Sequence, residues 1–212
     1  MQSTFSLLQG APLLPIIQPN SVEEGLHLAE AIANSGLRNI EVVKRSDAAF
    51  EALSAIRQRF PELLVGMGTL LNRNHVFEAL DAGAQFLITP TLSEILLDAL
   101  IASGAPFLPG VASPSDVLMA HQKGVREMKF FPAHLSGGAP FLKALGSVFS
   151  DVSFCPTGGI NGENAHEYLA LSNVKAVGGT WMIPASAIKA KDWSSITQAC
   201  QRSLTLFQEV AA

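Results

Sequence analysis

The chain has 212 residues, a formal net charge of −4 and no cluster of basic residues, which argues against nucleic-acid binding through a basic surface. Its 48% of hydrophobic residues can form one large core, but no apolar run approaches the roughly 18 residues of a membrane span. Its two cysteines are too few for a disulfide framework, and the first ten residues do not resemble a signal peptide. These features predict a soluble, cytoplasmic protein.

Short apolar runs recur along the chain about every 20 to 26 residues, which is the length of one strand–helix unit. Each run is bounded by glycine, proline or polar residues, as strands are. The predicted strands are Leu13–Ile17, Asn39–Val43, Leu64–Gly66, Phe86–Thr89, Phe107–Pro109, Glu127–Phe130, Ser153–Cys155 and Ala176–Val177.

Amphipathic stretches separate these runs and predict helices. The first begins near Ser21, where Ser21 and Glu24 predict a capping box. Ser93 and Ser115 are predicted N-caps of later helices. Glycines stand where helices are expected to end, at Gly36, Gly83, Gly104 and Gly124. The other helices are predicted at Ala48–Phe60, Asn74–Ala82, Ser93–Ser103, Ser115–Lys123, Pro140–Phe149, Glu163–Leu171 and Trp193–Glu209.

Eight strands that are each followed by a helix predict a closed (β/α)₈ TIM barrel. No linker or low-complexity tract interrupts the alternation, so residues 1–212 are expected to form a single domain. The alternative is an open, doubly wound sheet. It is disfavoured because no Gly-x-Gly-x-x-Gly follows the first strand.

The segment Glu127–Pro132 places Lys129 inside an apolar run that is typical of a buried strand. A fully buried lysine needs a partner or a function. Burial disfavours the ammonium form, and the neutral amine can attack a ketone to form a Schiff base. The alternative is that Lys129 extends from the end of the strand to solvent.

Three other polar residues fall at the carboxyl ends of predicted strands, where TIM barrels carry their active sites. The alternation of Asn39–Val43 points Glu41 into the barrel, where its charge needs a partner. Facing Lys129, Glu41 is either an ion partner or a general acid–base. Arg45 and Thr69 suit a substrate carboxylate, because a guanidinium binds carboxylates in a two-pronged fashion. Arg45 alone is more typical of a surface cation.

Two glycine-rich segments follow the last two predicted strands, at Thr157–Gly159 and Gly178–Thr180. Glycines let backbone N–H groups approach an anion, and these two loops are the usual phosphate site of a TIM barrel. Tight turns are the simpler explanation for either loop alone. Pro90 ends the fourth predicted strand and is a further candidate for substrate contact.

Together these residues resemble the 2-keto-3-deoxy-6-phosphogluconate (KDPG) and 4-hydroxy-2-oxoglutarate (KHG) aldolases, small class I lyases of the Entner–Doudoroff pathway. The resemblance extends from Pro15 to Trp181 and is most specific at Lys129–Ala133, Gly66–Asn72 and Phe154–Ile160. It implies a Schiff-base aldolase that acts on a small keto acid, uses no metal or organic cofactor and assembles as a homotrimer.

The resemblance also implies a role for each matching residue. Lys129 matches the Schiff-base lysine and Glu41 the acid–base glutamate. Arg45 and Thr69 match residues that hold the pyruvyl carboxylate, and Phe131 matches an aromatic wall of the pyruvate pocket. The residues that match the phosphate-binding loops are Thr157, Gly158, Gly159, Gly179 and Thr180.

Three positions depart from the common family pattern and leave the substrate preference open. Lys44 adds a cation beside the predicted carboxylate site, and we interpret its side chain as pointing out of the barrel. His134 replaces an acidic residue that often follows Phe-Pro-Ala. Met67 replaces a smaller residue between two glycines.

Several alternative functions remain open at this level. The chain could act on the galactonate epimer of KDPG, or it could be a non-catalytic phosphate-binding barrel or a phospho-ligand isomerase. A metal-dependent aldolase is disfavoured because the five histidines are scattered without ligand spacing. Catalysis by Cys155 is disfavoured because no His–acid pair is adjacent to it.

Overall fold

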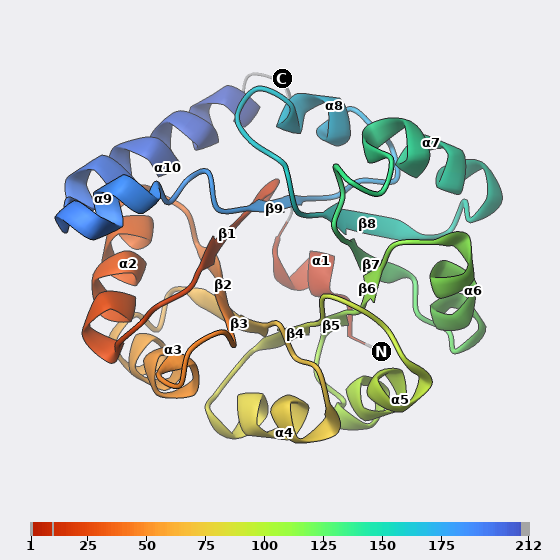
Figure 1. The fold of residues 1–212 in the computed structure, drawn as a ribbon, viewed down its shortest axis with the longest axis horizontal. Helices are drawn as coiled ribbons and strands as arrows, with labels where there is room; N and C mark the ends of the chain where they lie inside the picture. Colours follow the sequence, from red (N-terminus) through yellow and green to blue (C-terminus); the bar gives the residue numbers. More distant parts are fainter. Residues whose placement is uncertain (1, 10, 209–212) are drawn as a thin grey trace.

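The computed structural model describes residues 2–9 and 11–208, in which parallel strands form the wall of a barrel and helices surround it (Figure 1). One sheet has the order β5-β4-β3-β2-β1-β9 and the other the order β6-β7-β8. Within them, β2 pairs with β3 so that Glu41 lies opposite Gly66 and Val43 opposite Gly68. The strands are β1 Leu13–Ile17, β2 Asn39–Val43, β3 Leu64–Gly68, β4 Phe86–Ile88, β5 Phe107–Leu108, β6 Gly110–Val111, β7 Glu127–Phe130, β8 Ser153–Pro156 and β9 Val177–Gly179.

The two sheets meet at two places, which close the barrel as predicted. A parallel bridge between Thr157 and Gly178 joins the end of β8 to β9. At the other junction, the single strand predicted at Phe107–Pro109 is divided into β5 and β6. Pro109 separates them because it has no N–H to donate to a ladder, although its carbonyl accepts a hydrogen bond from the Lys129 N–H at 2.9 Å.

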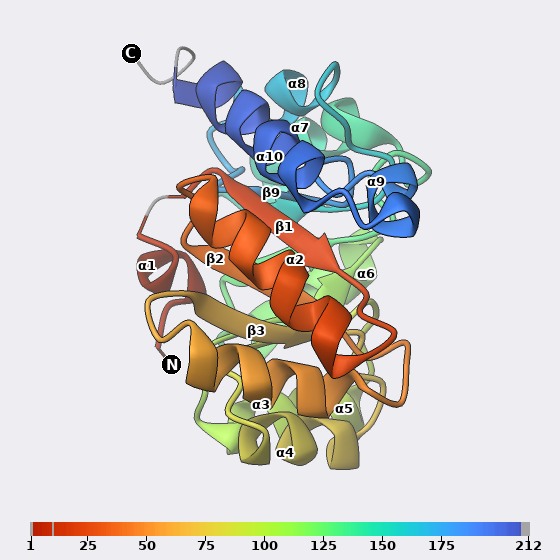
Figure 2. The same cartoon turned by 90° about the vertical axis from the view of Figure 1, so that its left-hand side faces the viewer.

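The predicted helices are present with boundaries shifted by a few residues. Figure 2 shows α10, α2 and α3 side by side on the outer face of the barrel. The short helices α1 and α9 were not predicted from the sequence. Glu209, the predicted end of the last helix, lies outside the described residues. The helices are α1 Thr4–Leu7, α2 Val22–Asn34, α3 Ala49–Arg59, α4 Arg73–Asp81, α5 Glu94–Ser103, α6 Pro114–Gln122, α7 Gly138–Val148, α8 Ala165–Leu169, α9 Ala185–Ala190 and α10 Trp193–Gln208.

Helix N-termini confirm part of the predicted capping. Ser21 and Ser93 are N-caps. The capping box at Ser21 was wrong, because the Glu24 carboxylate accepts from the Asn20 N–H instead of closing back on Ser21. Ser115 was also wrong as an N-cap: the N-cap lies two residues earlier, at Ser113, which forms a full capping box with Asp116 around Pro114.

Helix C-termini follow the glycine prediction. Four helices end next to a glycine with a left-handed backbone, a conformation that glycine adopts at little cost. These glycines are Gly36, Gly83, Gly104 and Gly124. No helix of the described part of the chain is long and apolar enough to cross a membrane.

Near the amino ends of the strands, the barrel interior is filled by apolar side chains such as Leu14, Phe86 and Leu108. Helix α1 packs against these side chains and closes this end of the barrel. The Glu127 carboxylate holds α1 in place by accepting hydrogen bonds from the N–H groups of Thr4 at 2.7 Å and Phe5 at 3.0 Å. This end, which we call the floor of the barrel, is therefore covered by α1. A substrate site is expected at the opposite end, the rim, where the strands have their carboxyl ends.

Candidate active site

The strongest feature of the barrel interior is an ion pair between β7 and β2. The Lys129 Nζ donates to Glu41 Oε1 at 3.1 Å and lies 3.4 Å from Oε2. Lys129 is 5% exposed and Glu41 is 0% exposed. The alternative in which Lys129 reaches solvent is therefore wrong, and the predicted meeting of Lys129 with Glu41 is confirmed.

The strand alternation explains how this pair forms. On β7, Met128 and Phe130 pack outward into the core between wall and helices, so Lys129 points inward. On β2, Ile40 and Val42 pack outward in the same way and turn Glu41 inward. A charge at this depth is costly without a partner, and each residue supplies one for the other.

Phe131 forms one wall beside the pair. Its ring centroid lies 5.6 Å from the Lys129 Nζ, within the range of a cation–π contact. A Cβ at Gly158 would come within 3.1 Å of the Phe131 ring, so the loop after β8 packs closely on this wall. Phe131 and Gly158 therefore lie side by side.

Arg45 and Thr69 follow the carboxyl ends of the paired strands β2 and β3. Arg45 is exposed and Thr69 is half-buried. Thr69 has a φ of 61°, which is an unusual, strained conformation for a β-branched residue. The Lys44 Nζ lies 5.5 Å from the Phe50 ring centroid of α3, so Lys44 points away from the barrel interior, as we interpreted.

The loops after β8 and β9 adjoin one another at the same rim. Gly158 and Gly159 have φ values of 96° and 75°, so both turns require glycine. Gly178 and Gly179 lie in β9 and not in the loop predicted after it. Both sites require a small residue, because a Cβ at Gly178 would meet Thr157 Oγ1 at 2.5 Å and one at Gly179 would meet the Trp181 ring at 2.1 Å.

Two threonines of these loops differ in their surroundings. Thr157 is 5% exposed, and its Oγ1 is buried without a hydrogen-bond partner among the described residues. Thr180 is exposed. An unpaired buried hydroxyl is costly, and a ligand oxygen at this loop would satisfy it.

Pro90 lies at the junction of β4 and β6. A Cβ at Gly110 would approach the Pro90 carbonyl carbon to 2.3 Å, and the Gly110 N–H donates to Thr89 Oγ1 at 2.9 Å. Thr89 in turn donates to the Thr91 carbonyl at 2.7 Å. The structure therefore gives Pro90 a packing contact that the sequence did not indicate.

The thiol nearest to the pair is not suited to act as a nucleophile. Cys155 of β8 lies opposite Lys129 in the register of the sheet. Burial raises the pKa of Cys155 to about 12, although the nearby Lys129 charge opposes the shift. Within residues 2–9 and 11–208, no group of three or more His, Cys, Asp or Glu side chains could hold a metal ion.

Two residues of the barrel strands had no predicted role from the sequence. They are Glu127, the first residue of a predicted strand, and Gly68, which lies within the Gly66–Asn72 motif. The strand alternation could have placed Glu127 inside the barrel, but its partner helix α1 was not predicted.

His134 connects two loops of the same rim. Its backbone N–H donates to the Gly158 carbonyl at 3.0 Å and so joins the loop after β7 to the loop after β8.

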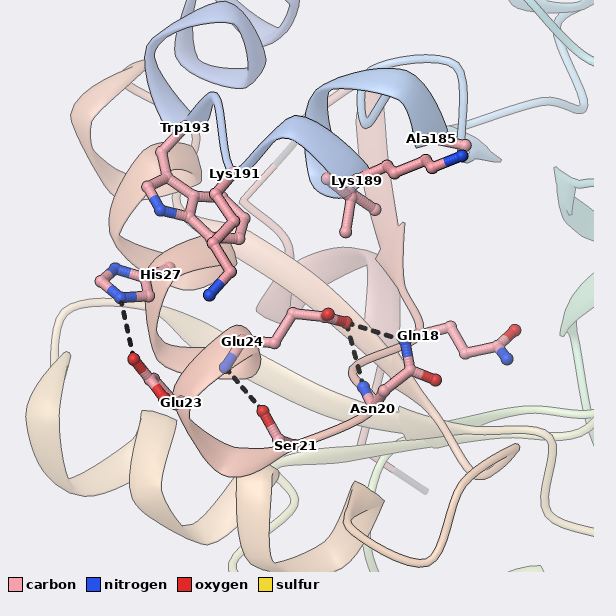
Figure 3. Close-up of a pocket in the computed structure, with 11 residues that line it drawn as sticks. Gln18, Asn20, Ser21, Glu23, Glu24, His27, Ala185, Lys189, Lys191 and Trp193 are labelled. Carbon is pink, nitrogen blue, oxygen red and sulfur yellow. Dashed lines mark hydrogen bonds and ion pairs between the residues drawn. The ribbon is translucent and has the colours of Figure 1, made fainter.

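A separate hollow of about 640 Å³ lies between the start of α2 and the segment α9–α10 (Figure 3). None of the predicted site residues lines it. Within it the Glu24 carboxylate accepts hydrogen bonds from Asn20, and the His27 and Trp193 rings stack with their centroids 5.0 Å apart. This hollow is therefore separate from the Lys129–Glu41 pair.

Comparison with known proteins gives a consistent result. Residues 5–199 match the family model described as KDPG and KHG aldolase. The chain is 40% identical to the KHG/KDPG aldolase of Escherichia coli K12 and covers 95% of each chain. It is also 40% identical to the 2-dehydro-3-deoxy-phosphogluconate aldolase of Dickeya dadantii over 92% of each.

A solved structure extends the comparison to three dimensions. The KDPG aldolase of Legionella pneumophila, crystallised with pyruvate captured as a covalent carbinolamine, superposes with a TM-score of 0.92. Its sequence is 40% identical, and the match covers 95% of the present chain and 98% of the Legionella chain.

Proposed function

Because this chain belongs to the KDPG and KHG aldolase family of lyases, we propose that it cleaves KDPG to pyruvate and glyceraldehyde 3-phosphate through a Schiff base. The same chemistry would cleave KHG to pyruvate and glyoxylate. The observation that carries the proposal is the buried amine of Lys129, 3.1 Å from the carboxylate of Glu41 at the open end of the barrel.

In the first half of the reaction, the neutral Lys129 amine attacks the C2 ketone and forms a carbinolamine. Glu41 transfers the protons that allow water to leave, which gives an iminium. The iminium is an electron sink, and the amine that forms it is already placed beside its proton carrier.

In the second half, Glu41 accepts the proton of the C4 hydroxyl, directly or through a water. The C3–C4 bond breaks, its electrons move to the iminium nitrogen, and the aldehyde product leaves. The remaining enamine is protonated at C3, and water then hydrolyses the new iminium to release pyruvate and restore Lys129. Positioned acid–base assistance of this kind is typically worth about 10²–10⁴-fold in rate.

The remaining roles concern substrate binding. Arg45 and Thr69 hold the carboxylate next to the ketone, while Phe131 and Pro90 form walls. The phosphate lies on the loops that carry Thr157, Gly158, Gly159, Gly179 and Thr180. The unpaired Thr157 hydroxyl supports this assignment, since it offers a donor to a phosphate oxygen.

The protein is further proposed to work as a single-domain homotrimer in the cytoplasm. Large apolar side chains that are exposed in one chain, such as Ile95, Leu135 and Val148, support an assembly that covers part of them. The two free cysteines suit a reducing compartment. Light scattering after size-exclusion chromatography would give the mass of the assembly, and a monomer at micromolar concentration would rule out the trimer.

The proposal is tested by trapping the Schiff base. The protein is treated with pyruvate and sodium borohydride, and the adduct is mapped by peptide mass spectrometry in the wild type and in Lys129→Ala. A reduced pyruvyl adduct on Lys129, absent in the variant, is the expected result. A folded wild type that forms no adduct would refute the class I mechanism.

A further inference from the structure

Gly66 and Gly68 lie on the same inward face of β3, but different groups occupy the space that a side chain would take. A Cβ at Gly66 would meet the Phe86 ring at 2.1 Å, inside the apolar core of the barrel. A Cβ at Gly68 would meet Glu41 Oε1 at 1.9 Å, Cδ at 2.7 Å and Cγ at 2.9 Å. The three nearest heavy atoms at Gly68 therefore all belong to Glu41.

The backbone on either side of Gly68 is held in place. The Lys44 N–H donates to the Gly68 carbonyl at 2.9 Å, and the Leu70 N–H donates to the Ile88 carbonyl at 3.3 Å. Thr69, between these two anchors, has a left-handed backbone. A methyl group added to Gly68 could not be accommodated by a simple shift of β3, so the Glu41 side chain would have to move.

The Glu41 side chain has little freedom to move without leaving Lys129. It is 0% exposed, and its carboxylate is bound to the Lys129 Nζ. We propose that Gly68 is a positioning residue that holds open the space in which the Glu41 carboxylate reaches Lys129. This inference rests on the proposed role of Glu41 as the proton carrier of the reaction.

The test follows one step that depends on Glu41, the exchange of pyruvate methyl protons with solvent. An enzyme that forms the enamine of pyruvate exchanges these protons in D₂O, and proton NMR measures the rate without any aldehyde. We expect Gly68→Ala to slow the exchange about a hundredfold, since a misplacement of about 1 Å at a reacting group costs that much.

A double-mutant cycle with Glu41→Asp separates positioning from a general loss of packing. Aspartate lacks the Oε1 that lies closest to the new methyl, so Gly68→Ala should slow the exchange by a much smaller factor in the Glu41→Asp background. The same factor in both backgrounds would overturn the proposal. If Gly68→Ala alone does not fold, the single variant Glu41→Ala is the reference, and adding Gly68→Ala to it should lower its stability only slightly. A double variant that is unfolded where Glu41→Ala itself folds would also overturn the proposal.

Gly66→Ala is the matched control. Its methyl would meet a core aromatic ring, so we expect a lower midpoint of urea unfolding and wild-type exchange by the folded protein. Equal losses of exchange in Gly66→Ala and Gly68→Ala would show that both act through barrel packing and would refute the inference. A wild type that neither exchanges protons nor forms the borohydride adduct would refute the proposed function instead.

Discussion

Glu127 and Glu41 both project from the barrel wall, one at each end of the strands, and they differ in what they bind. Glu127 accepts hydrogen bonds from the backbone N–H groups of Thr4 and Phe5 and from the Ser3 hydroxyl. Glu41 binds the amine of Lys129. The donors to Glu127 belong to α1 and its N-cap, whereas the donor to Glu41 is the amine for which we propose the Schiff base. The same type of side chain therefore holds a helix at the amino ends of the strands and, as we propose, carries protons beside Lys129.

The largest effect is expected at the rim. Glu41→Gln keeps an oxygen acceptor for the Lys129 Nζ, so the variant should fold, but it can no longer carry protons. KDPG cleavage should fall by about 10²–10⁴-fold, measured as pyruvate release coupled to lactate dehydrogenase. Circular dichroism provides the control for folding, and near-normal cleavage by a folded variant would contradict the assignment of Glu41.

A smaller effect is expected at the exposed edge of the same rim. Arg45→Ala removes a cation whose proposed role is to bind the substrate carboxylate. A hydrogen bond to a charged group contributes about 1.5–3 kcal/mol, so KM for KDPG should rise by roughly ten- to a hundredfold with a smaller change in kcat. Steady-state kinetics measure both constants. An unchanged KM would remove Arg45 from the site.

The matched change at the floor should affect stability and leave chemistry intact. Glu127→Gln replaces one acceptor oxygen by an N–H₂ group that faces donors of α1, which should lower the free energy of unfolding by about 1–3 kcal/mol. Urea unfolding at equilibrium measures the loss. The folded variant should keep its wild-type kcat, and a large loss of kcat would mean that the two ends of the barrel are coupled.

The smallest effect is expected from the thiols. Burial raises the pKa values of Cys155 and Cys200 to about 12, so both remain protonated at pH 8. Iodoacetamide should therefore leave both cysteines of the native protein unmodified and the activity unchanged, as followed by intact mass. Rapid modification of Cys155 together with loss of cleavage would reopen thiol chemistry beside Lys129.

The strand alternation correctly predicted which side chains point into the barrel near the rim. It placed Lys129 and Glu41 inward because their neighbours in sequence are apolar on both sides. It did not predict the division of one strand at Pro109 or the start of α6 at Ser113, since each depends on local backbone geometry. The short helices α1 and α9, of four and six residues, were also missed.

The sequence by itself determined the barrel, the inward direction of the lysine and the glutamate, and the family resemblance, because these depend on periodicity and on local motifs. Only the tertiary structure decided which groups meet. It brought Lys129 to 3.1 Å from a residue 88 positions earlier in the chain, and it gave Glu127 a helix to hold. It also distinguished the two glycines of β3, which are equivalent in sequence. The group that occupies the space beside each glycine, Phe86 at Gly66 and Glu41 at Gly68, comes from a neighbouring strand. These neighbours come together only when the barrel closes.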